Sequence, residues 1–502
     1  NSLGWAWPPG LSRHQGSAHA LFGATRGTRC TKRGWLEMIS ISLNEIASAI
    51  DGELHGSADV LVTGSVETDS RLVVPGSLFF AKPGEFDDGH NFVAAAKAGG
   101  AVAAVVERLV DVDLPQIVVS SAVKALGSLA SYVLTQIRTK TDIKVVGITG
   151  SNGKTTTKNM LREILSKAGS TVAPIESYNN EVGAPISILK AGFDTKFLVV
   201  EMGAGGPGSI EYLANLANPD VGVILKVGLA HVGEFGGIDS TAKIKSELAA
   251  ALGAEKHLVL NADDAFVREM AEHSQASIIW FGTALEAGFR ADQQALSIEG
   301  TGFVCHWPDG QQRRINLQIL GEHHIMNALA ALAVADQLGI DREVACQAIE
   351  SMPLAERWRM QLLHRTDGVT IINDAYNASP DSTKAALQTL AQLGKSGRRT
   401  IAVLGEMAEL GSVAREQHDA IGRVVVRLNI DQLVVVGDAA KLIHMGALQE
   451  GSWDGESKFF DEIDDALSYL RAMLEPNDIV LVKSSKSANL RHLGDALVEV
   501  SQ

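Results

Sequence analysis

The sequence predicts an α/β protein of three domains, and three observations lead to this prediction. From Ile143 onward, short apolar strands alternate with helical stretches, which is typical of a parallel sheet covered by helices. The same alternation returns after Pro353 and indicates a second doubly wound, Rossmann-like unit. The length of 502 residues corresponds to about three domains of roughly 150 residues. The predicted domains are residues 38–139, 140–353 and 354–502.

The residues before Met38 differ from the rest of the chain. They contain several basic residues and three tryptophans but no acid before Glu37. An acid-poor leader with arginines is also the composition of a transit peptide. Because a well-patterned apolar segment begins at Met38, we expect residues 1–37 to be a disordered extension or an artefact. They are excluded from the predicted fold.

The first predicted domain is a small α/β unit, and the second is a parallel-sheet domain. In the first, strand-like and helical pieces alternate at Leu78–Ala81, Phe92–Ala98 and Ala101–Val106. In the second, the strand candidates are Lys144–Thr149, Phe197–Met202, Val221–Val227 and His257–Asn261.

A hairpin meander is predicted for residues 285–320, before an alanine-rich buried helix at Asn327–Leu338. The third domain has its strand candidates at Thr370–Asn373, Thr400–Leu404, Leu433–Val436 and Ile479–Val482. In such a sheet, ligands usually bind beyond the carboxyl ends of the strands.

Composition excludes several classes of protein. No run of 18 apolar residues is present, so a membrane span is not expected. The formal net charge is −15 with no basic stripe, which argues against nucleic acid as a partner. The three cysteines are widely spaced, give no disulfide framework or metal cluster, and suit the cytosol.

Gly147–Thr157 has the order of a phosphate-binding loop: a buried strand, a glycine-rich turn and then Lys-Thr. Lys154 can reach the β- and γ-phosphates of a nucleotide, and Thr155 can bind a magnesium ion. Ile148 stands where the strict motif has glycine, and a plain glycine-rich turn is the alternative. We predict ATP and Mg²⁺ as cofactors, with the nucleotide bound by Gly150, Ser151, Asn152, Gly153, Lys154, Thr155 and Thr156.

Two carboxylates follow apolar strands. Glu201 ends the strand beginning at Phe197 and is placed to hold magnesium beside the loop, although a solvated strand end would look the same. Asp374 ends the strand before a turn and can hold a ribose hydroxyl. The alternative for Asp374 is turn or helix-capping chemistry.

A histidine and two arginines are further candidates. His231 follows the strand that begins at Val221 and is either a metal ligand or an ordinary loop residue. Arg357 and Arg359 flank Trp358, and an arginine here can meet a γ-phosphate or simply stack on the tryptophan. The chain lacks the serine-hydrolase, zinc-protease, protein-kinase and guanine-binding motifs, so those classes lose support.

Together these stretches resemble the Mur ligases, the ATP-dependent amide-bond-forming enzymes of peptidoglycan synthesis, from about residue 39 to the C-terminus. The family's ATP loop resembles Gly147–Thr156, which accounts for Ile148. Further similar stretches are Thr68–Arg71, Pro75–Phe79, Asp88–His90, Asn179–Pro185, Asp374–Pro380 and Gly405–Gly411. The chain departs from the family at Lys483–Lys486, where Lys-Gly-Ser-Arg is usual, and at Glu406, where Asp is usual.

The resemblance implies roles for individual residues. Thr155, Glu201, His231 and Lys245 would serve two magnesium sites, with Lys245 carbamylated and Lys243 the weaker candidate. Asn327 would contact adenine, Asp374 the ribose and Arg359 the γ-phosphate. The catalytic set would be Lys154, Lys245, His231 and Arg359. Ser70, Asp88, Asn179 and Asn180 would hold the UDP-sugar, so that the first domain is a UDP-binding domain.

The resemblance also implies an activity. The substrates would be UDP-N-acetylmuramoyl-tripeptide and D-alanyl-D-alanine, joined through an acyl phosphate by a cytoplasmic, monomeric enzyme. Two alternatives stay open: another ligase of this superfamily, adding an amino acid or resembling folylpolyglutamate synthases, and a P-loop ATPase without ligation. Asn179 and Asn180 disfavour the amino-acid-adding ligase of the preceding step, which has a Thr pair there. The N-terminal domain disfavours the ATPase.

Overall fold

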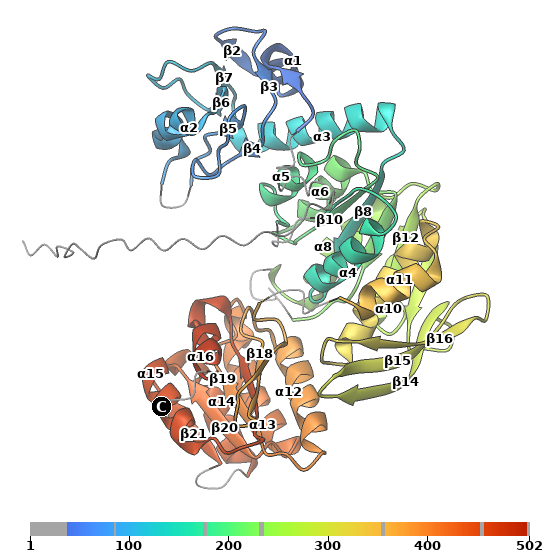
Figure 1. Ribbon diagram of the computed structural model, residues 1–502, viewed down its shortest axis with the longest axis vertical. Coiled ribbons are helices and arrows are strands. Elements are labelled where there is room, and N and C mark those ends of the chain that lie inside the picture. Colours follow the sequence, from blue (N-terminus) through green and yellow to red (C-terminus); the bar gives the residue numbers. More distant parts are fainter. Residues whose placement is uncertain are drawn as a thin grey trace, which may run out of the picture. The chain divides into compact units, whose positions relative to one another are not determined.

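The computed structural model describes residues 38–84, 87–173, 178–229, 235–352, 357–451 and 456–498. The described residues belong to one compact unit. The unit contains three larger sheets, each formed within one of the three predicted domains (Figure 1). The predicted three-domain α/β architecture is therefore confirmed, whereas its boundaries stay predictions.

The N-terminal domain has a five-stranded sheet in the order β2-β7-β6-β5-β4 and a two-stranded pair, β1-β3. Ser42 begins the first helix with a capping box, in which its hydroxyl and the Glu45 carboxylate satisfy each other's backbone N–H groups. The elements are β1 (Ile41–Ser42), α1 (Leu43–Ala49), β2 (Glu53–His55), β3 (Leu61–Val62), β4 (Val66–Glu67), β5 (Leu78–Phe80), α2 (Val93–Gly99), β6 (Ala103–Val106), β7 (Gln116–Val118) and α3 (Ala122–Lys140).

The central domain has a nine-stranded sheet in the order β16-β15-β14-β13-β12-β11-β8-β10-β9. Its strands are parallel from β9 to β14, and β14, β15 and β16 form an antiparallel meander. The elements are β8 (Lys144–Thr149), α4 (Lys154–Ser166), β9 (Thr171–Val172), α5 (Gly183–Ile188), β10 (Phe197–Glu201), α6 (Ser209–Ala217), β11 (Val221–Ile224), α8 (Ile238–Ala251), β12 (His257–Asn261), α9 (Ala265–Glu269), β13 (Ser277–Gly282), β14 (Phe289–Ser297), β15 (Gly300–His306), β16 (Gln312–Leu317), α10 (His323–Gln337) and α11 (Arg342–Glu350).

Helices cover both faces of this central sheet because its strands are apolar on both faces. Val145 and Leu198 pack in one buried cluster with residues of α3, α5, α6 and α8. Val146 and Val199, the next residues along the same strands, pack in another cluster with α4, α10 and α11. Successive side chains of a strand point to opposite faces, so continuous apolar strands bury both.

The C-terminal domain repeats this arrangement in a six-stranded sheet, ordered β17-β18-β22-β19-β20-β21, with only β17 antiparallel. Leu481 packs with α12, α13 and α14, whereas its neighbours Val480 and Val482 pack with α15 and α16. The elements are β17 (Gln361–His364), β18 (Thr370–Asn373), α12 (Pro380–Gly394), β19 (Thr400–Leu404), α13 (Ala414–Arg427), β20 (Gln432–Val436), α14 (Lys441–Glu450), β21 (Ser457–Phe460), α15 (Ile463–Met473), β22 (Ile479–Lys483) and α16 (Leu490–Ala496).

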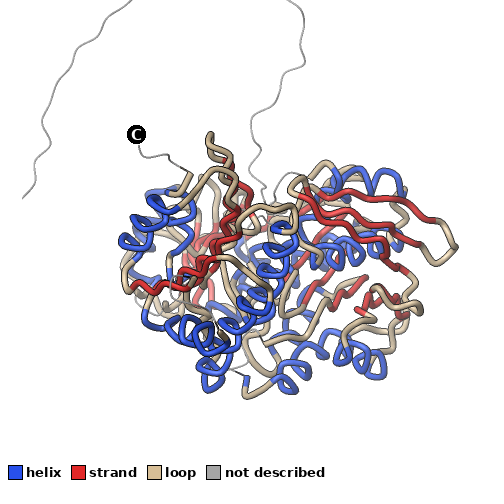
Figure 2. The backbone as a smooth tube through the Cα atoms, turned by 90° about the horizontal axis from the view of Figure 1, so that it is seen from below, coloured by secondary structure: helices blue, strands red, loops and turns tan. Residues whose placement is uncertain are grey.

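The predicted strands and the meander are present, but the sequence interpretation missed several strands, among them β7, β9, β13, β17 and β21. In Figure 2 the strands lie in layers flanked by helices, as the two sets of buried clusters require. The meander strand β14 contains a bulge between Asp292 and Ala295, where Gln293 has a φ of 48°. A bulge shifts the alternation of inward and outward residues, which hides the strand from pattern analysis.

Candidate active site

One cavity of about 370 Å³ joins the carboxyl ends of strands from two sheets. Glu201 ends β10 and Lys483 ends β22, while the glycine loop follows β8 and Asp374 follows β18. The cavity thus lies where a doubly wound sheet usually binds its ligand. Its lining consists of Ser151, Asn152, Gly153, Lys154, Thr155, Thr156, Asn179, Glu201, His323, His324, Asn327, Arg359, Met360, Asp374, Tyr376, Asn377, Ser379, Ser382 and Lys483.

The glycine loop leads directly into α4, so its backbone N–H groups meet at a helix N-terminus. Gly153 has a φ of 88°, and a Cβ there would lie 2.2 Å from Asn327 Oδ1. Only glycine therefore fits this position. Lys154 donates a hydrogen bond to the Gly150 carbonyl over 2.7 Å. Burial lowers the pKa of Lys154, whereas Glu201 acts to raise it.

The carboxylate of Glu201 collects three polar side chains in a buried cluster. Thr155 Oγ1 donates over 3.1 Å to Oε2, and Asn179 Nδ2 donates over 3.0 Å to Oε1. Lys158 Nζ lies 3.4 Å from Oε2, and its side chain is only 1% exposed. The predicted approach of Thr155 to Glu201 is thus present. Their oxygen atoms are the ligand type that Mg²⁺ prefers.

Lys158 was missed in the sequence, although a signal exists. It lies one helical turn after Lys154 on α4, so both lysines occupy the same face of that helix. A lysine is almost never fully buried unless it is paired. A second lysine four residues after the loop lysine therefore indicated a carboxylate partner.

Lys245 is buried on α8 with 3% of its surface exposed. Burial, together with the smaller effect of the positive charge of Lys154, lowers its pKa to about 7. Its neighbour in the sequence, Lys243, is exposed on the same helix. His231 lies outside the described residues. Among the residues that are described, no three His, Cys, Asp or Glu side chains are grouped to hold a metal by themselves.

Asp374 is held by two hydrogen bonds on the C-terminal side of the cavity. Lys483 Nζ donates to its Oδ2 over 2.6 Å, and the Met360 N–H donates to its Oδ1 over 2.9 Å. The capping alternative for Asp374 is wrong, because Ser379 is the N-cap of α12 and Pro380 its first residue. Asp374 therefore lies in the cavity, where a ribose contact is geometrically open to it.

Arg359 and Arg357 take different positions around Trp358. The Arg357 guanidinium lies 4.7 Å from the Trp358 ring centroid and pairs with Asp495 over 2.8 Å. The Arg359 guanidinium lies 4.1 Å from the Tyr376 ring centroid, and both residues line the cavity. Arg357 is thus the arginine that stacks on Trp358, and Arg359 is the one of the two that lines the cavity.

A smaller cavity of about 240 Å³ adjoins this one and shares Asn152, Gly153, His323 and Asn327 with it. Its remaining lining includes the apolar side chains Leu225, Phe281 and Met326. A polar cavity beside an apolar one suits a nucleotide, whose phosphates are charged and whose base is flat and largely apolar.

His323 was also missed by sequence reasoning. Burial lowers its pKa to about 4, so its imidazole is neutral at neutral pH, and it faces both cavities. Two consecutive histidines at the start of a buried alanine-rich helix were the available signal.

The residues expected at the UDP-sugar fall into two groups. Asn179 lies at the cavity beside Glu201, whereas the Asn180 carboxamide accepts the Gly183 N–H over 2.8 Å at the start of α5. Ser70 and Asp88 lie in the N-terminal domain and do not line either cavity. Hydrogen bonds from Arg108 and His90 hold the Asp88 pKa far below its usual range.

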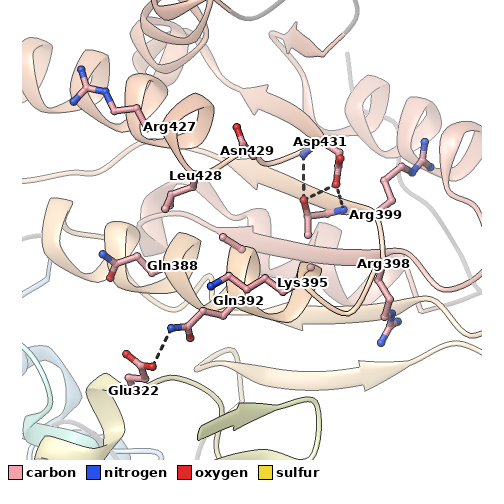
Figure 3. Close-up of a pocket in the computed structure, with 14 residues that line it drawn as sticks. Glu322, Gln388, Gln392, Lys395, Arg398, Arg399, Arg427, Leu428, Asn429 and Asp431 are labelled. Carbon is pink, nitrogen blue, oxygen red and sulfur yellow. Dashed lines mark hydrogen bonds between the residues drawn. The ribbon is translucent and has the colours of Figure 1, made fainter. Parts of the chain in front are cut away.

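A larger cavity of about 860 Å³ lies in the C-terminal domain beside α12 and the end of α13 (Figure 3). Its arginines serve the fold itself. Arg398 donates to backbone carbonyls, Arg399 pairs with Asp478 over 2.6 Å, and Arg427 pairs with Glu450 over 2.7 Å. The labelled arginine heads point away from the cavity centre. The three arginines of this cavity are therefore engaged within the fold, and Lys395 is a further cation in its lining.

Comparison with known proteins yields three family models along the chain. The model described as the Mur ligase middle domain matches residues 148–335, and the Mur ligase glutamate ligase domain matches residues 358–486. The catalytic-domain model of the Mur ligase family matches residues 63–133.

Two curated relatives are UDP-N-acetylmuramoyl-tripeptide–D-alanyl-D-alanine ligases. That of Mycobacterium tuberculosis is 39% identical over 92% of this chain and 98% of its own length. That of Escherichia coli is 31% identical over 92% of this chain and 99% of its own length.

Solved structures agree with these relatives. MurF from Acinetobacter baumannii has a TM-score of 0.83 at 31% identity, covering 92% of this chain and 99% of that one. MurF ligase from Thermotoga maritima, solved in complex with ADP, has a TM-score of 0.75 at 27% identity, covering 86% and 96%.

Proposed function

The chain belongs to the Mur ligase family, and on this basis we propose that it is the ADP-forming ligase that joins D-alanyl-D-alanine to UDP-N-acetylmuramoyl-tripeptide during peptidoglycan precursor synthesis. The observation that supports this most directly is the cavity in which the ATP loop and Glu201 meet Arg359 and Asp374. A phosphate-binding wall and a second wall with an arginine are the parts that activation of a carboxylate by ATP requires.

The proposed reaction has two steps. A carboxylate oxygen of the tripeptide attacks the γ-phosphorus of ATP, the bond to the bridging oxygen breaks, and ADP leaves. The amine of the dipeptide then attacks the acyl phosphate carbon, inorganic phosphate leaves, and the amine loses a proton. Carboxylate and triphosphate repel each other, so Lys154 and Arg359 would supply the compensating positive charge in a site with little water.

Mg²⁺ fits the oxygen atoms of Thr155 and Glu201. When bound, it would neutralise phosphate charge and polarise the phosphorus–oxygen bonds. His231 would be a further ligand. Lys245 would contribute as a carbamate, which turns a cation into a carboxylate-like ligand.

The surroundings of Lys245 support carbamylation. The neutral amine attacks the carbon of CO₂, forms a carbon–nitrogen bond and releases one proton. A lysine with an ordinary pKa offers very little neutral amine at neutral pH. Because burial lowers the pKa of Lys245 to about 7, a large fraction of this amine is neutral there.

The remaining assignments follow the two cavities and the resemblance. Asn327, beside Gly153 and the apolar cavity, would contact the adenine, and Asp374 the ribose. Ser70, Asp88, Asn179 and Asn180 would hold the UDP-sugar. We place the domain boundaries near residues 140 and 353, and propose a monomer in the cytoplasm. No helix in the described ranges has the length and apolar character of a membrane span.

The test is phosphate release from ATP and Mg²⁺ with UDP-N-acetylmuramoyl-tripeptide, with and without D-alanyl-D-alanine. We expect release to require both substrates, and the product to be heavier by the dipeptide residue. Release that requires a single amino acid instead would assign the chain to another ligase of the family. Release without any acceptor would indicate an ATPase.

A further inference from the structure

We propose that Tyr376 is a positioning residue that holds the Arg359 guanidinium toward the terminal phosphate of ATP. The inference rests on the proposed function, in which Arg359 meets the γ-phosphate. Only ATP, and not ADP, carries the γ-phosphate that Arg359 would meet. Tyr376 should therefore strengthen the binding of the triphosphate more than that of the diphosphate.

Arg359 stacks on the ring of Tyr376. The Arg359 guanidinium carbon lies 4.1 Å from the centroid of the Tyr376 ring, well within the range of cation–π attraction. Both residues line the cavity that contains Lys154 and Thr155. Stacking uses the flat face of a guanidinium, whereas phosphate oxygens bind its N–H groups in the plane, so both contacts can be made together.

The backbone on either side of Arg359 is strained. Trp358 and Met360 have φ values of 65° and 46°, in the left-handed region that residues other than glycine rarely adopt. Such conformations persist only where surrounding contacts hold them, and they cluster at functional sites. Here the strain falls on both neighbours of the arginine.

The contacts that hold this backbone come from the same segment as the tyrosine. The Tyr376 N–H donates to the Trp358 carbonyl over 3.1 Å, and the Met360 N–H donates to Asp374 Oδ1 over 2.9 Å. Asp374 is in turn fixed by Lys483. The turn after β18 therefore supports both the backbone and the guanidinium of Arg359.

Arg357 provides an internal control. It also stacks on an aromatic ring, at 4.7 Å from Trp358, but its side chain is 63% exposed and it does not line the cavity. Arg357→Met is therefore expected to leave nucleotide binding unchanged.

The experiment measures the dissociation constants of ADP and of the β,γ-imido analogue of ATP by titration calorimetry, in the presence of Mg²⁺. The full chain carries Tyr376→Leu, Tyr376→Phe, Arg359→Met or Arg357→Met. We expect Tyr376→Leu to weaken analogue binding about tenfold with ADP binding changed less than about twofold, since a cation–π contact of a partly buried pair has that size. Tyr376→Phe keeps the ring and should stay within about twofold of the parent.

The outcomes separate two failures. If Arg359→Met weakens ADP and analogue equally, the role of Arg359 in the proposed function is wrong. If Arg359→Met discriminates between them and Tyr376→Leu does not, the role of Tyr376 is wrong. The positioning role of Tyr376 is also wrong if Tyr376→Leu weakens the binding of ADP and of the analogue equally. It is wrong as well if Tyr376→Phe loses as much affinity for the analogue as Tyr376→Leu does. Tyr376→Met replaces the leucine variant if that variant does not fold.

Discussion

The two walls of the cavity are built in different ways. On the central wall, Ser151–Thr156 is one contiguous segment that runs from the glycine loop after β8 into the first turn of α4. The C-terminal wall takes Arg359, Asp374 and Lys483 from three separate segments. Asp374 and Lys483 meet because Asn373 and Val482 are partners in the parallel pair β18–β22. The first wall is therefore local in sequence, and the second depends on strand pairing.

Their electrostatics differ as well. On the C-terminal wall, Lys483 and Asp374 form a one-to-one pair with side chains 2% and 15% exposed. On the central side, Lys158 pairs with Glu201 over 3.4 Å, and burial lowers the pKa of both Lys154 and Lys245. A lysine pKa lowered by burial means that the charged form of the side chain is disfavoured there. A bound anion would offset this cost on the central side, whereas the C-terminal wall carries one net positive charge, that of Arg359.

The largest expected effect follows from removing the central cation. Lys154→Met should reduce the rate of ligation by about 1000-fold or more, because the phosphate charge loses its buried partner. Steady-state phosphate release checks this, with Lys144→Met as control, since Lys144 pairs with Asp142 at a side-chain exposure of 40%. A Lys154→Met enzyme with a substantial residual rate would remove Lys154 from the catalytic set.

Breaking the ion pair of Lys483 and Asp374 on the C-terminal wall should lower the free energy of unfolding. Lys483→Met leaves the Asp374 carboxylate without its ion-pair partner and should cost about 3 kcal/mol, about a 100-fold change in a folding equilibrium. Thermal unfolding of the full chain measures the loss. The exposed pair of Lys441 and Asp438, at 3.8 Å, supplies the control, and Lys441→Met should change stability by less than about 0.5 kcal/mol. Equal effects would mean that Lys483 stabilises nothing beyond a surface pair.

Gly153→Ala tests the close contact between the glycine loop and Asn327 of α10. The added Cβ would meet Asn327 Oδ1, and the φ of 88° is strained for alanine. We expect a loss of about 100-fold in kcat/KM for ATP, the scale of a misplacement of about 1 Å. Gly310→Ala is the control, because Gly310 has a similar φ of 86° but open space around it. Equal losses would assign the effect to backbone strain rather than to Asn327.

The smallest expected effect is a pH dependence from Lys245. Its folded-state pKa is about 7, below the ordinary value, so the amine becomes protonated as the pH falls through 7. Carbamate formation, and activity with it, should fall about tenfold for each unit below that pH and recover partly with added bicarbonate. Carbon-13 NMR with labelled bicarbonate would detect the carbamate, and the exposed Lys243 is the control in Lys243→Ala. An unchanged carbamate signal in Lys245→Ala would assign it elsewhere.

The lowered pKa of Lys245 also makes the free energy of unfolding depend on pH. The sign is opposite to that for a lysine whose pKa is raised by an ion pair. The folded state binds fewer protons at Lys245 than the unfolded state between pH 7 and the ordinary pKa of 10.5. Stability of the unmodified chain should therefore rise with pH across that interval.

Much of the fold was accessible from pattern alone. Lys144–Thr149, His257–Asn261, Thr370–Asn373 and Thr400–Leu404 were predicted with the bounds that the structure has. These strands are buried on both faces, so their apolar runs are continuous. By contrast β17 is an edge strand without a fully buried residue, and no alternation of period two marks it.

The sequence by itself determined the glycine loop, the order of strands and helices, and the carboxylates placed at strand ends, because these depend on neighbours a few residues apart. Only the tertiary structure decided that Lys158 faces Glu201, that Arg359 stacks on Tyr376 while Arg357 stacks on Trp358, and that Asp374 is held by Lys483. These contacts join distant segments through strand pairing and helix packing. The spacing of residues in the sequence does not predict which side chains such packing brings within contact distance.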